Sequence, residues 1–347
     1  MRTRPLGLPA AAFLLLVSSS CVTARTDHLP GPPKRAVIVD TDAGTDDLMA
    51  ITMLLARGDV RVVGITVANG LAHVPAGAEN VLRLLTLAGH FEIPVYAGRS
   101  TPLAGTAAFP DEWRQVCDKL PGVTLPAARR MVESRSAAEF LAERLSDRAA
   151  PVDLLVLGPL TNIAEAFARR PEAARTVRSI VIMGGAVDVP GNIREGFPDA
   201  SNAAEFNIFV DPEAAREVFA SGAALLLVPL DATNGVPIDA RFVDDVRANA
   251  GTPAGRFVVE VLGTIRDWIS TGTYYAWDLV ATALFLDPTI AQSREGRLLV
   301  ATTGGDAGRT TLDRGSPAAH VATAIDAAAF RRILVRSVQA SAPQKER

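Results

Sequence analysis

The most restrictive feature of the sequence is an aliphatic run that leads directly into four carboxylates. Residues 37–39 read Val-Ile-Val, residues 40–47 read Asp-Thr-Asp-Ala-Gly-Thr-Asp-Asp, and an amphipathic segment follows at 48–56. This order predicts a buried parallel strand, a tight turn and a helix. Asp46 and Asp47 then fall at the helix N-terminus, where the helix dipole favours negative charge.

The other two acids of this stretch, Asp40 and Asp42, lie at the carboxyl end of the predicted strand. Like charges so close together repel one another, and a divalent cation is the simplest compensation. Because the available ligands are oxygens and no cysteine or histidine is nearby, a hard ion such as Ca²⁺ or Mg²⁺ is favoured. The alternative is a strand-to-helix turn whose acids only cap the helix.

The composition is that of an ordinary soluble protein with one large core. The chain has 347 residues, of which 48% are hydrophobic and 21% charged. Strands alternate with helical stretches throughout, so residues 36–340 are predicted to form a single α/β domain. The net charge is -3, and no basic run is interleaved with aromatic residues, which argues against a nucleic-acid-binding surface.

Residues 1–24 have the form of a secretory signal. Arg2 and Arg4 precede an apolar run that is too short to span a bilayer and that ends in small residues. Two processing sites compete: cleavage before Cys21, slightly favoured, which would make it a lipid anchor, and ordinary cleavage after Ala24. Either one predicts export to a bacterial periplasm or cell envelope.

The segments that flank the domain are short. Residues 25–35 contain three prolines and are predicted to be a linker, and residues 341–347 form a polar tail. Since Cys21 belongs to the processing site, Cys117 is left alone, and no internal disulfide is expected.

The order of the apolar segments predicts the fold class. Aliphatic runs at 61–67, 152–157, 179–183 and 224–229 alternate with helical stretches, and residues 297–312 look like a hairpin. This pattern predicts a doubly wound, mostly parallel sheet flanked by helices. Ligands bind such sheets outside the carboxyl ends of the strands. Polar and glycine-rich residues gather at those ends: Asp40, Asp42, Asn69, Leu157, Gly158, Met183, Gly184 and 229–231.

A long stretch at 98–135 shows little periodicity and many prolines. Loops of this length are usually functional lids or disordered. This one contains Phe109 and Trp113, and exposed aromatic rings on a loop suit a flat, π-rich ligand, so a lid is favoured. The alternative, that both rings pin the loop to the core, stays open on the sequence alone.

The motifs and their order resemble the nucleoside hydrolases, of the inosine-uridine-preferring type and its purine-specific branch. The opening signature of that family, Asp-x-Asp-Pro-Gly-x-Asp-Asp, is matched at 40–47, with Ala43 in place of the usual proline. The later motifs follow in the family's order: Gly-Pro-Leu-Thr-Asn at 158–162, Met-Gly-Gly at 183–185, Ala-Glu-Phe-Asn at 204–207, Asp-Pro-Glu-Ala-Ala at 211–215 and a late aspartate at Asp278.

The resemblance implies a Ca²⁺ ion held by Asp42, Asp47, Asp278 and the backbone carbonyl of Leu157. It also implies that Asp42 is the general base for a calcium-bound water. An all-oxygen cage suits Ca²⁺, and a cation lowers the pKa of its bound water enough for a carboxylate to remove the proton near neutral pH.

The sugar contacts implied by the resemblance are polar groups that suit ribose hydroxyls: Asp46, Asn69, Asn192, Glu205 and Asn207. Because residues 191–202 look like an insertion, Asn202 competes with Asn192 for its place. The implied reaction is hydrolysis of the N-glycosidic bond through an oxocarbenium-like transition state. Glu205 and Asp46 would stabilise its positive charge, and Met183 is expected to pack beneath the site.

The residue before the late aspartate predicts the base specificity. Many hydrolases of the inosine-uridine type have histidine there, whereas this chain has Trp277, and none of its four histidines is near. Trp277, with Phe109 and Trp113, resembles the purine-specific branch, which stacks the base between two tryptophans. We therefore expect purine ribonucleosides to be the substrates. Trp268 is expected to be plain core, and Tyr274 and Tyr275 either line the base pocket or only pack.

Two other functions are compatible with parts of the sequence. A haloacid-dehalogenase-type phosphatase also opens with a strand into Asp-x-Asp, with Asp40 as nucleophile and Asp42 as acid and base. A lipid-anchored receptor would bind nucleosides without turnover. In each case the partner is a small molecule and the membrane is reached only through Cys21. A homodimer or a homotetramer is compatible with the sequence.

Overall fold

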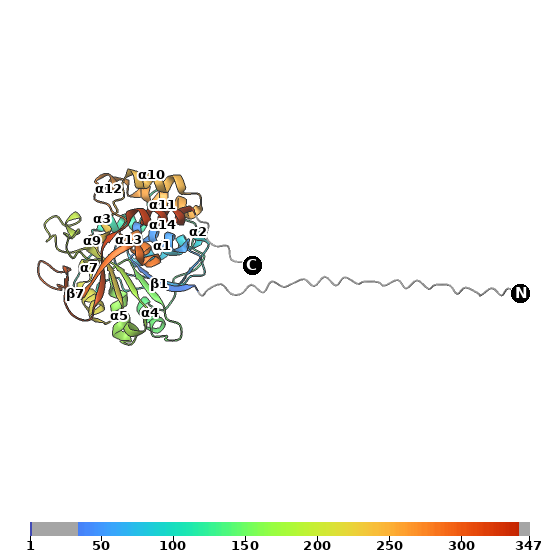
Figure 1. Cartoon of the computed structure of the whole chain (residues 1–347). Coiled ribbons are helices and arrows are strands. Elements are labelled where there is room, and N and C mark those ends of the chain that lie inside the picture. Colours follow the sequence, from blue (N-terminus) through green and yellow to red (C-terminus); the bar gives the residue numbers. More distant parts are fainter. Residues whose placement is uncertain (2–33, 340–347) are drawn as a thin grey trace. The chain divides into compact units, whose positions relative to one another are not determined.

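The computed structural model describes Met1 and residues 34–339. The predicted signal segment with Cys21, nearly all of the linker and the tail lie outside the described residues. Residues 34–339 form one compact unit (Figure 1). Within 34–339, no helix is long and apolar enough to cross a membrane.

A nine-stranded sheet with the order β3-β2-β1-β4-β5-β6-β9-β7-β8 runs through this unit. Strands β1 to β6 pair in parallel with one another and β9 pairs in parallel with β6, whereas β7 is antiparallel to both β9 and β8. The predicted doubly wound, mostly parallel sheet is confirmed, and the predicted hairpin is β7 with β8. The strands are β1 (Arg35–Thr41), β2 (Val60–Val67), β3 (Val95–Ala97), β4 (Asp153–Val156), β5 (Ile180–Met183), β6 (Leu225–Val228), β7 (Ala291–Val300), β8 (Thr310–Asp313) and β9 (Ala319–Ile325).

Helices cover both faces of the sheet (Figure 1). One layer contains α1 (Thr45–Leu55), α2 (Val74–Ala88), α10 (Ala240–Asn249), α11 (Pro253–Thr264), α13 (Trp277–Leu286) and α14 (Ala327–Gln339). The other contains α4 (Ala137–Leu145), α5 (Thr161–Arg169), α6 (Ala173–Thr176) and α8 (Pro212–Ala220). Shorter elements connect them: α7 (Phe206–Val210), α9 (Leu230–Thr233), α12 (Arg266–Ser270), η1 (Ile193–Glu195) and η2 (Pro288–Ile290).

Strand β1 shows why the apolar run belongs at the centre of the sheet. Val37 and Val39 pack into the core shared with α1 and α13, and Ile38 packs into the core shared with α4 and α5. A strand buried on both faces reads as a continuous aliphatic run, because neither side needs polar residues. Its carboxyl end therefore delivers Asp40 and Asp42 to the rim of the sheet.

The turn between β1 and α1 contains Ala43 at the position where the family signature has proline. Ala43 has φ 56°, in the left-handed region. Proline, whose ring fixes φ near about -65°, could not adopt this conformation. The replacement at position 43 therefore accompanies a distinct turn geometry in this chain.

The expectation of an irregular stretch at 98–135 is wrong in one part, because α3 (Asp111–Lys119) forms inside it. Pro110 precedes the helix, Asp111 and Glu112 occupy its first turn, and Lys119 lies in its last. This charge order complements the helix dipole, but Cys117 is the helix's only fully buried residue. A short helix with so little buried surface gives no clear apolar periodicity in the sequence.

Candidate active site

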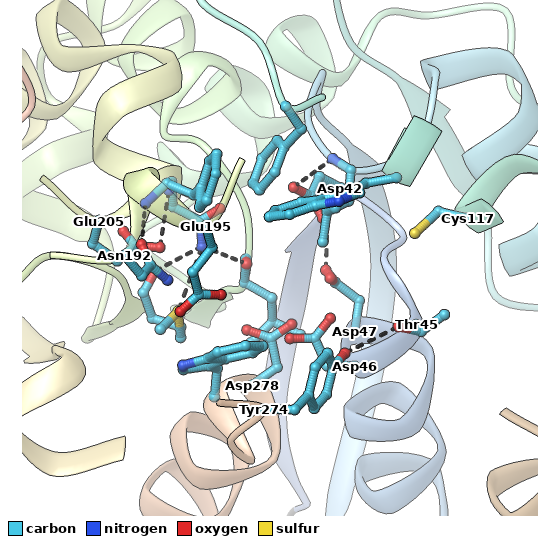
Figure 2. Close-up of a pocket in the computed structure, with 18 of the residues that line it drawn as sticks. Asp42, Thr45, Asp46, Asp47, Cys117, Asn192, Glu195, Glu205, Tyr274 and Asp278 are labelled. Carbon is cyan, nitrogen blue, oxygen red and sulfur yellow. Dashed lines mark hydrogen bonds between the residues drawn. The ribbon is translucent and has the colours of Figure 1, made fainter. Parts of the chain in front are cut away.

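A pocket opens at the carboxyl ends of β1, β4 and β5 (Figure 2). Every predicted site residue except Asn69 lines it: Asp42, Asp46, Asp47, Phe109, Trp113, Leu157, Met183, Asn192, Glu205, Asn207, Trp277 and Asp278. Sequence reasoning missed further lining residues, among them Thr45, Leu71, Cys117, Glu195, Phe206, Trp268 and Thr273. Of the two tyrosines whose role the sequence left open, Tyr274 lines the pocket and Tyr275 does not.

One side of the pocket is a group of buried acids, Asp42, Asp46, Asp47 and Asp278, which we call the carboxylate floor. Asp46 and Asp47 occupy the first turn of α1, and Asp278 occupies the first turn of α13. Oxygens of Asp46, Asp47 and Asp278 lie within 4.8 Å of one another. The two helices pack against each other, and this packing brings a late aspartate to the acids of the opening motif.

Local hydrogen bonds hold the floor in place. The Asp47 carboxylate accepts from the Thr41 hydroxyl, from the Asp42 backbone N–H at 3.2 Å and from the Gly44 backbone N–H at 3.2 Å. Asp42 Oδ2 accepts from the backbone N–H of Leu71 at 2.9 Å. The Asp47 carboxylate therefore holds the backbone of the turn at Asp42 and Gly44, and Asp42 ties this turn to the segment after β2.

Glycine is required beside Asp42 because other backbone segments approach it closely. A Cβ atom at Gly70 would lie 2.0 Å from Asp42 Oδ2, and one at Gly158 would lie 2.9 Å from the Asp42 backbone nitrogen. Both glycines follow strands of the parallel sheet. They confine the Asp42 side chain to one position at the pocket.

Burial and mutual repulsion raise the pKa values of the floor. The pKa of Asp46 rises to about 7, first through burial and then through the charge of Asp42. Burial, followed by neighbouring carboxylates, holds the pKa values of Asp47 and Asp278 well above the ordinary range. Burial also raises the pKa of Asp42, although the positive charge of Arg114 opposes this rise.

The donor set of the floor fits a hard divalent cation. Asp46 Oδ1 is buried and has no hydrogen-bond partner among residues 34–339. Unpaired buried carboxylates are costly, and oxygen ligands of this kind are those that Ca²⁺ and Mg²⁺ prefer. The tight trio of Asp46, Asp47 and Asp278 shares two members with the ligand set implied by the family resemblance. The carbonyl oxygen of Leu157 lines the same pocket and accepts from Asn207 Nδ2 at 2.9 Å.

The sugar-binding candidates are positioned by the start of α7. Glu205 caps this helix and accepts from the backbone N–H groups of Asn207 at 2.9 Å, Ile208 at 3.3 Å and Gly185 at 2.8 Å. Burial raises the Glu205 pKa to about 7. Asn192 lines the pocket, and its Oδ1 accepts from the Phe206 backbone N–H at 3.2 Å.

Asn202, the alternative to Asn192, does not line the pocket, and neither does Asn69. Asn69 is buried, and its Oδ1 accepts from Arg114 Nη2 at 2.9 Å. Arg114 lies on α3, next to Trp113. The hydrogen bond therefore ties the end of β2 to the helix that carries a predicted base-stacking residue.

The aromatic side chains that line the pocket, which we call the aromatic wall, are Phe109, Trp113, Trp268, Tyr274 and Trp277. Tyr274 and Trp277 lie beside the carboxylate floor, since the Tyr274 hydroxyl is 3.1 Å from that of Thr45 and Trp277 directly precedes Asp278. The ring centroids of Trp113 and Trp268 are 5.9 Å apart, those of Trp268 and Tyr274 are 6.5 Å apart and nearly parallel, and those of Tyr274 and Trp277 are 4.7 Å apart. Phe109 is buried and stacks on Phe206, so it both pins its loop and lines the pocket.

Trp268 corrects an expectation from the sequence. The stretch from Ala254 to Ser270 reads as one helix with Trp268 as core, but the structure ends α11 at Thr264 and begins α12 at Arg266. No residue of α12 is fully buried. Trp268 is half-buried: it packs against the edge of the core and also lines the pocket.

The phosphatase interpretation does not fit this geometry. Asp40, which would be the nucleophile, is fully buried and does not line the pocket. It accepts from the Thr66 hydroxyl and from Asn162 Nδ2 at 2.8 Å, and burial raises its pKa to about 7. Asp40 therefore joins β1, β2 and α5 and has no access to a substrate.

Known proteins share both the sequence and the fold. Residues 37–332 match the family described as inosine-uridine preferring nucleoside hydrolase. Probable uridine nucleosidase 2 of Oryza sativa subsp. japonica is 33% identical over 305 residues, which cover 86% of this chain and 88% of that protein. The pyrimidine-specific ribonucleoside hydrolase RihA of Citrobacter koseri is 37% identical over 226 residues, which cover 65% of this chain and 69% of that protein.

Solved structures agree with this relationship. A plant nucleoside hydrolase superposes with a TM-score of 0.79 at 29% identity, covering 89% of this chain and 100% of that chain. A purine-preferring ribonucleoside hydrolase from Gardnerella vaginalis superposes with a TM-score of 0.80 at 27% identity, covering 89% of this chain and 99% of that chain. The chain belongs to the inosine-uridine preferring nucleoside hydrolase family.

Proposed function

We propose that this nucleoside hydrolase cleaves the N-glycosidic bond of purine ribonucleosides to give the free base and ribose, with Ca²⁺ as its cofactor. The observation that carries the proposal is that a buried carboxylate floor and an aromatic wall line the same pocket. The floor suits a cation and a sugar carbon that becomes positive, and the wall suits a flat base.

Asp42, Asp47, Asp278 and the Leu157 carbonyl would hold the ion, with Asp46 beside them. When bound, Ca²⁺ lowers the pKa of a water molecule in the pocket. Asp42 accepts a proton from the attacking water as the water oxygen bonds to C1′ of the ribose. The bond from C1′ to the base nitrogen breaks, and its electron pair leaves with the base.

The remaining polar groups orient and stabilise the ribose. Asn192 and Asn207 offer amide groups to its hydroxyls, and the carboxylates of Glu205 and Asp46 face the developing positive charge. Electrostatic stabilisation by fixed groups in a buried site is a large contribution to catalysis. The backbone hydrogen bonds that fix Glu205 keep its carboxylate oriented before the substrate arrives.

The aromatic wall supports a purine preference, because a two-ring base offers more surface for stacking than a one-ring base. Stacking between Trp113 and Trp277 would also raise the basicity of the leaving base. A pyrimidine preference is the second candidate, since the rice and Citrobacter relatives are named for uridine or pyrimidine substrates.

A nucleoside panel tests both candidates. Inosine, adenosine, guanosine, uridine and cytidine are incubated with the protein in Ca²⁺, and the released base and ribose are measured by chromatography. Faster release of purine bases supports the proposal, and a higher kcat/KM for uridine or cytidine overturns the purine preference. The Asp42→Ala variant and a chelator should abolish product. Binding of nucleosides without product would favour the receptor alternative.

We further propose that the protein is exported, with Cys21 as its lipid anchor. Arg2, Arg4 and the apolar run that follows support the proposal. Mass spectrometry of the mature N-terminus tests it: an acylated Cys21 in the membrane fraction is expected, and an intact Met1 in the cytosol would contradict it.

A further inference from the structure

The proposed reaction leaves one proton unassigned. The electron pair that departs with the base must be neutralised, yet among residues 34–339 no histidine, lysine or arginine lines the pocket. The lining groups that can carry a proton are all acids, phenols or thiols: Asp42, Asp46, Asp47, Cys117, Glu195, Glu205, Tyr274 and Asp278.

Most of these groups are committed elsewhere. The four aspartates form the floor, and Glu205 already accepts from three backbone N–H groups. The hydroxyl of Tyr274 lies 3.1 Å from the Thr45 hydroxyl, and burial raises its pKa well above the ordinary range. Burial likewise holds the pKa of the Cys117 thiol well above its usual range.

Glu195 differs from all of them. Its side chain makes no hydrogen bond and no ion pair with any residue between 34 and 339, although it lines the pocket. Figure 2 shows it among the pocket residues, with its carboxylate directed into the site. Partial burial raises the pKa of this carboxyl group to about 7, so a substantial fraction is neutral near physiological pH. The residue as a whole is exposed, which gives its carboxyl group access to solvent protons.

The segment that carries Glu195 packs on the base-binding side of the pocket. Ile193 belongs to the same buried cluster as Phe109, with Trp113 packed against it. A Cβ atom at Gly196 would lie 2.5 Å from Pro110 and 3.1 Å from the ring of Phe206. Glu195 therefore sits between two residues that touch the aromatic side, within the insertion at 191–202.

We propose that Glu195 is the general acid that protonates the leaving base. The proposal rests on the proposed nucleoside hydrolysis. As the C1′–N bond breaks, its electron pair moves to the base nitrogen, and that nitrogen takes the proton of the Glu195 carboxyl group. Asp42 takes a proton from the attacking water. Solvent then protonates Glu195 and removes the proton from Asp42, so the net reaction is nucleoside plus water to base plus ribose.

The test compares two ribosides that differ in their need for an acid. Inosine releases a base that must be protonated, whereas p-nitrophenyl β-D-ribofuranoside releases p-nitrophenolate, which leaves without a proton. Glu195→Gln keeps the shape and polarity of the side chain but removes the acidic proton. We expect kcat for inosine to fall about a hundredfold with little change in KM. The rate for the nitrophenyl riboside should stay within about twofold of wild type.

The nitrophenyl substrate also reports whether the variant is folded. Glu112→Gln, an exposed glutamate on α3 outside the pocket, serves as the matched control and should leave both rates unchanged. Equal loss on both substrates in Glu195→Gln, or an unchanged inosine rate, would overturn the proposal while hydrolysis itself stands. If the wild-type protein cleaves neither riboside, the proposed function fails and the role of Glu195 fails with it.

Discussion

The two sides of the pocket are built in different ways. The acids of the carboxylate floor are between 1% and 5% exposed, and they stand at the end of β1 and the starts of α1 and α13 in the middle of the core. The aromatic wall comes from α3 and the loop before it, from α12, and from the start of α13 with Tyr274 before it. Helix α12 has no fully buried residue.

This difference separates chemistry from specificity. Groups fixed by the sheet and two packed helices hold their geometry, as a site for a cation and a general base requires. Segments outside the sheet tolerate changes in length and sequence, and binding preferences are commonly set by such segments. The floor should therefore govern kcat for every substrate, and the wall should govern which base is accepted.

The largest expected effect is on the floor. Asp42→Asn should lower kcat for all nucleosides by about 10²- to 10⁴-fold, because the amide cannot accept the proton of water. The fold should persist, since an amide oxygen can still accept from the Leu71 backbone N–H. Steady-state kinetics measure kcat, and circular dichroism measures whether the fold persists. Asp111→Asn, an exposed change on α3, is the control, and an Asp42→Asn rate near that of the control would contradict the role of Asp42.

The next effect concerns stability without metal. Burial raises the pKa values of Asp46 and Glu205 to about 7, so the folded state binds more protons than the unfolded state from about pH 4 to pH 7. The contribution of these two groups to the free energy of unfolding is therefore fully present below about pH 4, and it is lost as the pH rises through about 7. Ca²⁺ binds the folded state and should offset this loss.

Thermal melts in Ca²⁺ and in chelator measure this effect across that pH range. The difference in Tm between the two conditions should widen as the pH rises. A difference that stays constant with pH would show that these acids are not compensated by the ion.

The wall should show smaller and substrate-dependent effects. Trp277→Ala should lower kcat/KM for inosine by about ten- to a hundredfold, because stacking on a base contributes about 1–3 kcal/mol. The value of kcat/KM for uridine should fall less. Trp268→Ala should lower kcat/KM more weakly than Trp277→Ala, and again more for inosine than for uridine. If Trp277→Ala left turnover of purines unchanged and only weakened binding slightly, stacking would not activate the leaving base.

The smallest effect is expected where the two sides meet. Arg114→Met removes the hydrogen bond to Asn69 and should loosen α3, which carries Trp113. We expect KM for purines to rise about three- to tenfold with kcat less affected. Arg129→Met, an exposed change near Phe91, is the control. If kcat fell by a larger factor than KM rose, Arg114 would act on the catalytic step and not on binding of the base.

The same contrast explains what could be predicted from the sequence. Asp42 and Asp47 follow an aliphatic run that only a buried strand explains, so the floor was visible in local pattern. Asp278 was found only through the family resemblance, because no periodicity reports that α13 packs on α1. The strands and their mostly parallel order followed from alternating apolar segments.

The wall was less visible because its segments have little buried surface. Helix α3 buries one residue fully and left no periodic signal. Trp268 was assigned to the core because the apolar spacing continues past the break after Thr264, and a single glycine such as Gly263 does not by itself end a helix. Glu195 lies in an insertion that the family motifs do not cover. The resemblance placed only Asn192 or Asn202 of this stretch at the site, and only the fold shows that Glu195 lines the pocket.

The central claim is that aspartates from distant parts of the chain hold one Ca²⁺ that hydrolysis requires. Calorimetric titration of Ca²⁺ into chelator-stripped protein, with inosine hydrolysis measured on the same samples, tests it most directly. The account predicts one ion bound per chain, recovery of activity in step with binding, and neither in Asp278→Asn. Full inosine hydrolysis by stripped protein that binds no Ca²⁺ would contradict it.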